Sequence, residues 1–448
     1  MVAPTRLVVL QRASRPLQGV CARLASWGCG LHHCASRSET LAALTQGSAD
    51  IVMIDAAVQD GMSLVPELKA HAATRYLPVI AAATEDPAGV AAHALALGAD
   101  DIFILPLEDT ELFARIRALS RLAVMEVELR RREAVQAGFG VRPSHEAPAV
   151  PAIDRIGILL IGPAGGEQVQ VMTALGGAAS AAYAETAEGA LERLRRDDLD
   201  VAIITGGRDH HEVQSLAAAI RGDGVLFDLP LLLVAAADSF ADRTLPFRWG
   251  LSDVLFQPFH PEVLRLRVHC WVRQQRLRRR LRGDVEGGAL PPTTDRLTHL
   301  YAHGFLHAYV DHLIAQNQRL GTPLSVISFA IAQMRRVNQA CGYAAGDRAL
   351  AQLGLLLART SRAEDLPARL GDDRFCLVLN GVPGREARGT AERIATLLTE
   401  TPLALGQDQA VRLALRTGVA ELDHGDDAAA LITRAFERVQ LFGLRRAS

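Results

Sequence analysis

The strongest constraint on the fold of this chain is a long internal repeat. Pro78, Gly98 and Pro106 recur as residues of the same types, each 152 positions further along the chain, at Pro230, Gly250 and Pro258. The surrounding segments also match, since ADDIFILPLEDTELFARI corresponds to LSDVLFQPFHPEVLRLRV. A period this long indicates a duplicated domain rather than a solenoid of short repeats.

Each copy alternates short apolar segments with amphipathic ones. In the first copy we predict strands at residues 6–10, 50–55, 78–83 and 101–105. Segments such as DGMSLVPELKAHA and DPAGVAAHALALG lie between them and have the apolar spacing of helices. The alternation predicts an α/β fold in which helices cover both faces of a doubly wound parallel sheet.

Both copies resemble the receiver domains of response regulators, which are flavodoxin-like. In that family an aspartate ending the third strand accepts a phosphoryl group, and two acidic residues after the first strand hold Mg²⁺. Asp55 matches the acceptor, but Leu10 and Gln11 stand at the acidic positions. Phosphoryl transfer to a carboxylate needs a cation to offset the converging negative charge. Asp55 is a candidate phosphoacceptor by its position, but the acidic residues that would hold the cation are missing. The alternative is an aspartate kept for structure or docking.

The second copy departs further from the receiver pattern. Thr205 replaces the acceptor, and Ile161 and Gly162 replace the acidic pair, so an acyl phosphate cannot form there. A fold that loses its chemistry and keeps its shape is usually retained for contacts. The resemblance implies a homodimer through the receiver-like domains, because this family usually dimerises through the helix before the last strand and the last helix.

The C-terminal part has three motifs in order: DRLTHLY from residue 295, RVNQACGYAAGD from residue 336 and RLGDDRF from residue 369. Together they resemble the GGDEF family of diguanylate cyclases, which has an α+β fold. Two receiver-like domains followed by this one is the arrangement of PleD-type response regulators. The expected domains are receiver-like at 1–132, a linker at 133–152, pseudo-receiver at 153–286 and degenerate GGDEF at 287–448.

The resemblance also predicts that the cyclase site is degenerate. The family holds two Mg²⁺ ions with a DxD on the first strand and an acidic pair in the signature turn, but Ala330 and Ala332 stand at the DxD positions. Arg374 reverses the charge of one signature acid. We therefore expect no enzymatic activity, no catalytic residues and no metal ligands. Asn338 and Asp347 match the family's guanine contacts and are interpreted as vestigial. A weakly active diguanylate cyclase is the alternative.

A second site of the family is preserved. Its RxxD motif, which binds the inhibitory product cyclic di-GMP, corresponds to Arg362-Ala363-Glu364-Asp365, at the family's distance from the signature turn. An arginine fork can bond guanine O6 and N7 together, and a carboxylate can accept from guanine N1–H and N2–H. Arg393 matches the family's secondary arginine. The predicted ligand is cyclic di-GMP, with no cofactor. A scaffold that binds no nucleotide is the further alternative.

Composition limits the partners. The formal net charge is -2, which provides no general attraction for nucleic acid. No segment has the roughly 18 apolar residues of a membrane span, and no signal peptide is evident, so a cytoplasmic protein is expected. Cys29, His32, His33 and Cys34 match no common zinc spacing and are interpreted as reduced thiols and ordinary histidines.

The resemblance to inactive PleD-type regulators implies protein partners as well as cyclic di-GMP. It implies a role in cell-cycle control at the cell pole and in regulated proteolysis. Polar localisation factors and adaptors of the ClpXP protease are the partners that follow from it. The residues themselves carry no information about these partners.

Overall fold

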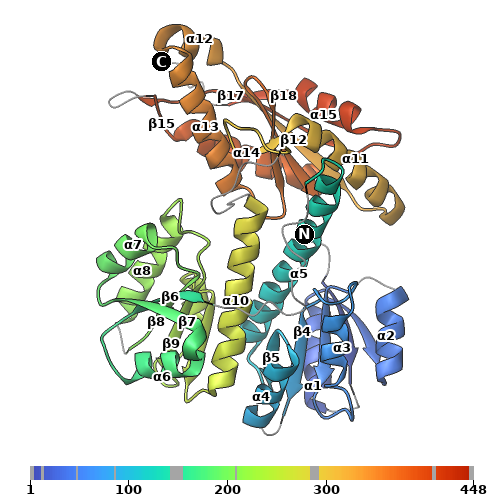
Figure 1. Cartoon of the computed structure of the whole chain (residues 1–448), viewed down its shortest axis with the longest axis vertical. Coiled ribbons are helices and arrows are strands. Elements are labelled where there is room, and N and C mark those ends of the chain that lie inside the picture. The colour runs from blue at the N-terminus through green and yellow to red at the C-terminus, as the bar shows by residue number, and fades with distance from the viewer. Residues whose placement is uncertain are drawn as a thin grey trace. The chain divides into compact units, whose positions relative to one another are not determined.

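The computed structural model describes residues 5–11, 15–46, 49–84, 87–141, 155–206, 209–282, 292–405 and 410–442 (Figure 1). The chain forms two compact units. One consists of residues 4–126 and 146–278, and the other chiefly of residues 127–145 and 279–448.

The first copy of the repeat is a five-stranded parallel sheet with the order β2-β1-β3-β4-β5. The strands are β1 (Arg6–Leu10), β2 (Gly30–Cys34), β3 (Ile51–Asp55), β4 (Val79–Ala83) and β5 (Asp101–Ile104). The helices are α1 (Arg15–Ser26), α2 (Arg37–Gln46), α3 (Leu64–Ala70), α4 (Pro87–Leu97) and α5 (Asp109–Ala137). Every residue of β3 and β4 is buried, as predicted for a sheet covered on both faces.

The second copy repeats this topology, with the order β7-β6-β8-β9-β10. Its strands are β6 (Ile156–Ile161), β7 (Ala179–Ala184), β8 (Val201–Ile204), β9 (Leu231–Ala236) and β10 (Asp253–Gln257). Its helices are α6 (Gly166–Leu175), α7 (Ala187–Arg196), α8 (His210–Gly222), α9 (Leu245–Arg248) and α10 (Pro261–Arg282). Both sheets have the flavodoxin-like order, which confirms the predicted fold class.

The duplication extends to individual ion pairs. Arg115 of α5 donates to Asp101 at the start of β5, with Nε 2.9 Å from Oδ2. At the same offset of the repeat, Arg267 of α10 donates to Asp253 at 3.2 Å. Both pairs are buried. The two copies of the repeat therefore share equivalent side-chain contacts as well as similar sequences.

The two copies pack against each other through their last helices. Strand and helix residues of both copies belong to one apolar core cluster, and Arg267 of α10 forms an ion pair with Glu111 of α5 across the contact. The last helix, which the family usually employs for dimerisation, is therefore partly covered within the chain. A homodimer through the receiver-like domains stays a prediction.

A buried ionic cluster lies at the same contact. Lys69, the only lysine of the chain, is 4% exposed and its Nζ lies 2.6 Å from Asp100 Oδ2. Arg273 of α10 lies 2.5 Å from the other oxygen of Asp100 and 2.8 Å from Glu126 Oε1. Because Lys69 pairs with Asp100 and Glu126 pairs with Arg273, removal of Asp100 or Arg273 would leave a buried charge without its opposite partner.

The other unit is built on a six-stranded mixed sheet with the order β11-β13-β14-β12-β17-β18. Its strands are β11 (Tyr301–Ala302), β12 (Leu324–Ile331), β13 (Leu366–Gly371), β14 (Arg374–Asn380), β17 (Leu415–Glu421) and β18 (Val439–Phe442). Only β11 and β13 pair in parallel among these described strands. A separate hairpin joins β15 (Leu403–Ala404) to β16 (Ala410–Val411).

Helices cover both faces of this sheet, because β12 alternates its side chains between two cores. One core contains Val326 together with α11 (His303–Leu320) and α15 (Ala428–Glu437). The other contains Ile327 together with α12 (Met334–Cys341), α13 (Tyr343–Thr360) and α14 (Gly384–Glu400). The last part of α5 belongs to the same unit and lies beside α11 (Figure 1).

The boundaries predicted from the sequence need one adjustment. Helix α5 continues to Ala137, so residues 133–137, predicted as the start of the linker at 133–152, are helical. The helix continues because Arg132 is fully buried and Val135 packs on the core of the C-terminal unit. Residues 142–152 lie outside the described residues. The other predicted domain limits stay predictions.

Within the described part of the chain, no helix combines the length and the apolar character that crossing a membrane requires.

Candidate functional site

The RxxD motif forms a closed four-residue turn between α13 and β13. The backbone N–H of Asp365 donates to the carbonyl oxygen of Arg362 at 3.2 Å. The backbone N–H of Arg362 donates in return to Oδ2 of Asp365 at 3.0 Å. The two named residues of the motif are thus brought together, and the carboxylate of the second fixes the backbone of the first.

Asp365 is the buried member of this turn, with 5% of its surface exposed. Burial raises the pKa of Asp365 to about 7, and the neighbouring charge of Glu364 adds to the rise. The backbone N–H of Arg362 and the guanidinium groups of Arg362 and Arg132 act in the opposite direction. The carboxyl group is therefore poised to change its charge near neutral pH.

Arg362 is the exposed member of the turn. Among the residues that the structure describes, its guanidinium makes no hydrogen bond and no ion pair, and in particular no ion pair with Asp365. An arginine side chain is usually committed to an acceptor when it has a structural role. The guanidinium of Arg362 is available to a ligand.

Two other RxxD matches in the sequence differ in this respect. Arg195 is 2.7 Å from Asp223 and forms an ion pair with it. Arg369 donates to Asp295 at 3.1 Å and to the carbonyl oxygen of Asp372 at 2.9 Å. Both guanidinium groups have partners within the protein, whereas that of Arg362 has no hydrogen bond or ion pair among the described residues.

Arg393 lies on α14, exposed between the buried residues Ala391 and Ile394. It makes no hydrogen bond or ion pair with any residue in the described ranges. The structure records no contact that joins Arg393 to the RxxD turn. Its assignment to the cyclic di-GMP site stays a prediction.

The signature turn is a hairpin. Strands β13 and β14 pair antiparallel and close at Gly371 and Arg374, with an irregularity after Arg369. Asp372 occupies the position of the family's second glycine and has a φ of 45°, in the left-handed region. Gly371 also has a positive φ, of 125°. The turn therefore has the positive φ angles that glycine adopts most easily, although one of the two positions is now an aspartate.

This conformation leads to a stability prediction. We expect Asp372→Gly to raise the free energy of unfolding by roughly 0.5–1 kcal/mol, because glycine adopts positive φ without a side-chain clash. Urea unfolding of the variant and the parent protein is the measurement. The matched control is Asp373→Gly at the next position, whose φ is not positive; it should not stabilise, and equal gains for both variants would refute the explanation.

The surroundings of Ala330 do not fit a magnesium ion. In the sheet register Ala330 lies directly opposite Arg374 of β14 on one side and Arg416 of β17 on the other. Directly opposed side chains share one face of a sheet, so two positively charged residues flank the position where the family has a carboxylate. Neither Ala330 nor Ala332 offers an oxygen ligand.

The comparisons with known proteins agree with the motifs. Residues 292–442 match the family model described as diguanylate cyclase, GGDEF domain. This part of the chain is a GGDEF domain. Over 404 residues the chain is 28% identical to the response regulator PleD of Caulobacter vibrioides, a match that covers 89% of this chain and 88% of that protein. The sequence is therefore homologous to PleD over most of its length.

Two further matches are confined to the GGDEF domain. The diguanylate cyclase DosC of Escherichia coli is 31% identical over 147 residues, which cover 33% of this chain and 32% of that protein. The crystal structure of the GGDEF domain of DgcB from Caulobacter crescentus in complex with c-di-GMP matches 33% of this chain and 86% of that chain, with 20% identity and a TM-score of 0.31.

The two residues predicted to be vestigial guanine contacts lie on neighbouring helices of the GGDEF domain. Asn338 is on α12, and its Oδ1 atom is buried without a hydrogen-bond partner among the described residues. This oxygen points at Gly346 of α13, because a Cβ atom added there would lie 1.9 Å from it. Asp347 follows Gly346 and is exposed. The assignment of these residues to guanine stays a prediction.

Asp55 ends β3 and is 6% exposed. Its Oδ1 accepts from the backbone N–H of Ala57 at 3.0 Å. Of the residues at the acidic positions, Leu10 is fully buried, and Gln11 is bonded to His33 Nδ1 at 2.9 Å. Within the described ranges, no three His, Cys, Asp or Glu side chains are placed to hold a metal ion. Phosphorylation of Asp55 stays an untested prediction.

The acceptor position of the second copy has changed shape as well as chemistry. A Cβ atom on Gly162 would lie 2.1 Å from the carbonyl oxygen of Thr205, so no acidic side chain fits there without a shift of the backbone. Glu167 instead accepts from the backbone N–H of Gly206. The second copy therefore has a closed loop contact where the family has its phosphorylation site.

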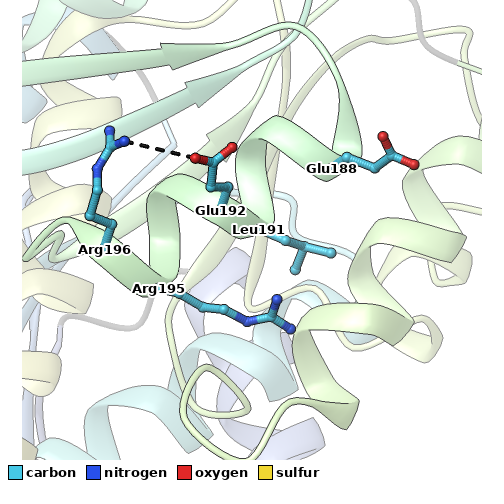
Figure 2. Close-up of a pocket in the computed structure, with 5 residues that line it drawn as sticks. All are labelled: Glu188, Leu191, Glu192, Arg195 and Arg196. Carbon is cyan, nitrogen blue, oxygen red and sulfur yellow. Dashed lines mark ion pairs between the residues drawn. The ribbon is translucent and has the colours of Figure 1, made fainter.

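A shallow cavity of about 390 Å³ lies on α7 (Figure 2). It is lined by Glu188, Leu191, Glu192, Arg195 and Arg196, all from one helix. Arg196 is directed at Glu192, 3.9 Å away (Figure 2), and Arg195 is paired with Asp223. A single helix face with paired charges does not define a ligand site.

One residue at the RxxD turn is not predicted from the sequence. Arg132 of α5 donates to the carbonyl oxygens of Ala363 and Asp365, at 3.2 and 3.0 Å. It belongs to a run of arginines at residues 130–132 in a segment that looks like an ordinary solvated helix face. No local pattern distinguishes the buried arginine from its neighbours, so only the tertiary contact reveals it.

Proposed function

We propose that this protein is a catalytically inactive cyclic di-GMP effector, which binds the dinucleotide at the RxxD turn of its GGDEF domain and acts through protein contacts. The observation that carries the proposal is the contrast within one domain. Arg362 has a free, exposed guanidinium beside the carboxyl group of Asp365, whereas the former metal position at Ala330 is flanked by two arginines.

The chemistry of the turn suits a guanine nucleotide. The guanidinium of Arg362 bonds guanine O6 and N7 together or stacks on the purine. Asp365 keeps Oδ1 for a ligand, because its turn uses Oδ2. Ionised Asp365 then accepts from guanine N1–H or N2–H, and the arginine also offsets the phosphate charge of the ligand. Arg393 is assigned to the same ligand.

The biological setting that we propose rests on resemblance alone. The combination of two receiver-like domains with a degenerate GGDEF domain most resembles PopA, an inactive paralogue of PleD. From that resemblance we propose a role in cell-cycle-dependent proteolysis by ClpXP at the cell pole, with polar localisation factors as partners. The receiver-like pair then provides docking or dimerisation.

The first experiment is incubation of the purified full chain with GTP and Mg²⁺. We expect no cyclic di-GMP, because lost metal ligands cost several kcal/mol each in transition-state stabilisation and each ~1.4 kcal/mol is tenfold in rate. The matched control is the PleD protein under the same conditions. Product above background would establish the alternative of a weakly active cyclase.

The second experiment is calorimetric titration of the full chain with cyclic di-GMP. Binding in the low micromolar range or tighter is the expected result, with GTP and cyclic di-AMP as ligand controls. An absence of heat at millimolar ligand would favour the alternative of a scaffold that binds no nucleotide.

A further inference from the structure

The RxxD turn is held from behind by one side chain of a distant helix. Arg132 of α5 is 1% exposed, and Nη2 donates to the carbonyl oxygens of Ala363 and Asp365, on either side of Glu364. Nη1 donates to the carbonyl oxygen of Leu281 at the end of α10, at 2.7 Å. One planar guanidinium therefore fixes the turn relative to the ends of two helices.

The position of Arg132 is itself fixed. Its Nε atom is 2.6 Å from Oε1 of Glu128, which is 2% exposed. The hydroxyl of Tyr309 on α11 donates to the same oxygen at 2.6 Å, and Arg132 lies over the ring of Tyr301, 5.4 Å from its centre. Burial alone would lower the pKa of Arg132, but Glu128 and the two tyrosines raise it. The Arg132 guanidinium therefore stays positively charged. Because it is buried, loss of its hydrogen-bond acceptors would be costly.

These hydrogen bonds couple the position of the RxxD turn to that of helix α5. A buried guanidinium that lost its carbonyl acceptors would be left unpaired, so a shift of the RxxD turn requires a matching shift of α5. Helix α5 begins at Asp109, and its part up to residue 126 belongs to the other compact unit. The helix is therefore one continuous element that begins in the receiver-like unit and carries Arg132, whose hydrogen bonds hold the turn.

From this geometry we infer that Arg132 is a positioning residue that sets the shape of the RxxD turn and transmits occupancy of the turn to helix α5. The inference rests on the proposed binding of cyclic di-GMP. Arg132 does not touch the ligand, because it contacts the backbone on the buried side of the turn. By reciprocity, a rearrangement of α5 in the receiver-like pair changes the affinity of the turn by the same factor.

The test uses Arg132→Lys, which keeps the charge and loses the fork that holds two carbonyls at once. We expect its affinity for cyclic di-GMP to fall on the order of tenfold, since two hydrogen bonds to a charged donor are lost. The matched control is Arg131→Lys, one position away, where Arg131 contacts Glu128 and not the turn. Its affinity should stay within twofold of the wild type.

Hydrogen exchange of the full chain separates transmission from simple packing. In the wild type, saturating cyclic di-GMP should slow the exchange of backbone amides at residues 127–137 of α5. In Arg132→Lys, at ligand concentrations that saturate the weakened site, this protection should be lost while protection of residues 362–366 remains. Equal protection of α5 in both proteins would overturn the inference.

The wild-type measurement stands even if the variant fails to fold. Protection of the turn without any change in α5 would overturn the inference by itself. Wild-type protein that binds no cyclic di-GMP would refute the proposed function instead, and the two failures are therefore distinguishable.

Discussion

Replacing Arg362 with alanine is expected to weaken cyclic di-GMP binding about 100-fold, which corresponds to about 2.7 kcal/mol. The loss combines a bidentate contact to guanine with the charge that offsets the phosphates. Since the guanidinium is exposed and makes no hydrogen bond or ion pair in the described part of the chain, the variant should fold and unfold like the wild type. Calorimetric titration of both proteins is the measurement.

Arg195→Ala is the matched control for this prediction. It removes the same residue type from another RxxD match, one that lies on α7 and whose guanidinium is paired with Asp223. Its affinity for cyclic di-GMP should equal that of the wild type. Similar isotherms for Arg362→Ala and the wild type would refute the assignment of the site.

Replacing Asp365 with asparagine is expected to stabilise the protein at neutral and alkaline pH while it weakens ligand binding. Burial raises the pKa of Asp365 to about 7, whereas an aspartate in an unfolded chain titrates near ~3.9. Below about pH 4 the carboxyl group is protonated in both states, and burial of a neutral group costs little. As the pH rises from there, the unfolded chain releases the proton that the folded state retains, and the stability of the wild type falls.

The loss is complete above the folded-state pKa, where it amounts to at most on the order of 4 kcal/mol. Asparagine never ionises, and its side-chain oxygen can still accept from the backbone N–H of Arg362. The variant should therefore match the wild type only below about pH 4 and exceed its stability increasingly up to about pH 7, above which the excess stays level. Urea unfolding across this range checks the sign, and a constant difference between the two proteins would contradict the explanation.

The same titration predicts a pH dependence of binding. If the carboxylate of Asp365 accepts from guanine, the affinity of the wild type should rise roughly tenfold between pH 6 and pH 8. Glu364, Arg362 and Arg132 are the charged neighbours that shape this titration. Asp365→Asn should bind weakly at both values, and an unchanged pH profile in that variant would point to a different titrating group.

The sequence predicted most of the fold because the apolar segments are unambiguous. The segments predicted as strands at residues 6–10 and 50–55 are β1 (Arg6–Leu10) and β3 (Ile51–Asp55), with bounds within one residue of the prediction. By contrast, β2 was not predicted. Its residues, GLHHC, are largely exposed on an edge strand, and polar edge strands lack the apolar run that marks a buried strand.

The site was predictable only in part, for a physical reason. Motif spacing located Arg362 and Asp365, because the turn is local in sequence. Their environment depends on residues far away along the chain. Burial raises the pKa of Asp365, and the guanidinium of Arg132 that holds the turn comes from α5. The arginine neighbours of Ala330 also became visible only when the strand register placed β14 and β17 beside β12.

The solitary lysine at the contact between the two receiver-like copies has a practical consequence. An endoproteinase that cleaves only after lysine has a single target in this chain, Lys69. The side chain of Lys69 is buried, and so inaccessible to the enzyme, in the native state. Lys69 is bonded to Leu77 and Asp100 of its own copy, so the rate of that one cut reports how often this part of the first copy opens, without any label or mutation. Receiver-directed phosphodonors, partner proteins and cyclic di-GMP could all be ranked on the same gel by whether they hasten or delay it.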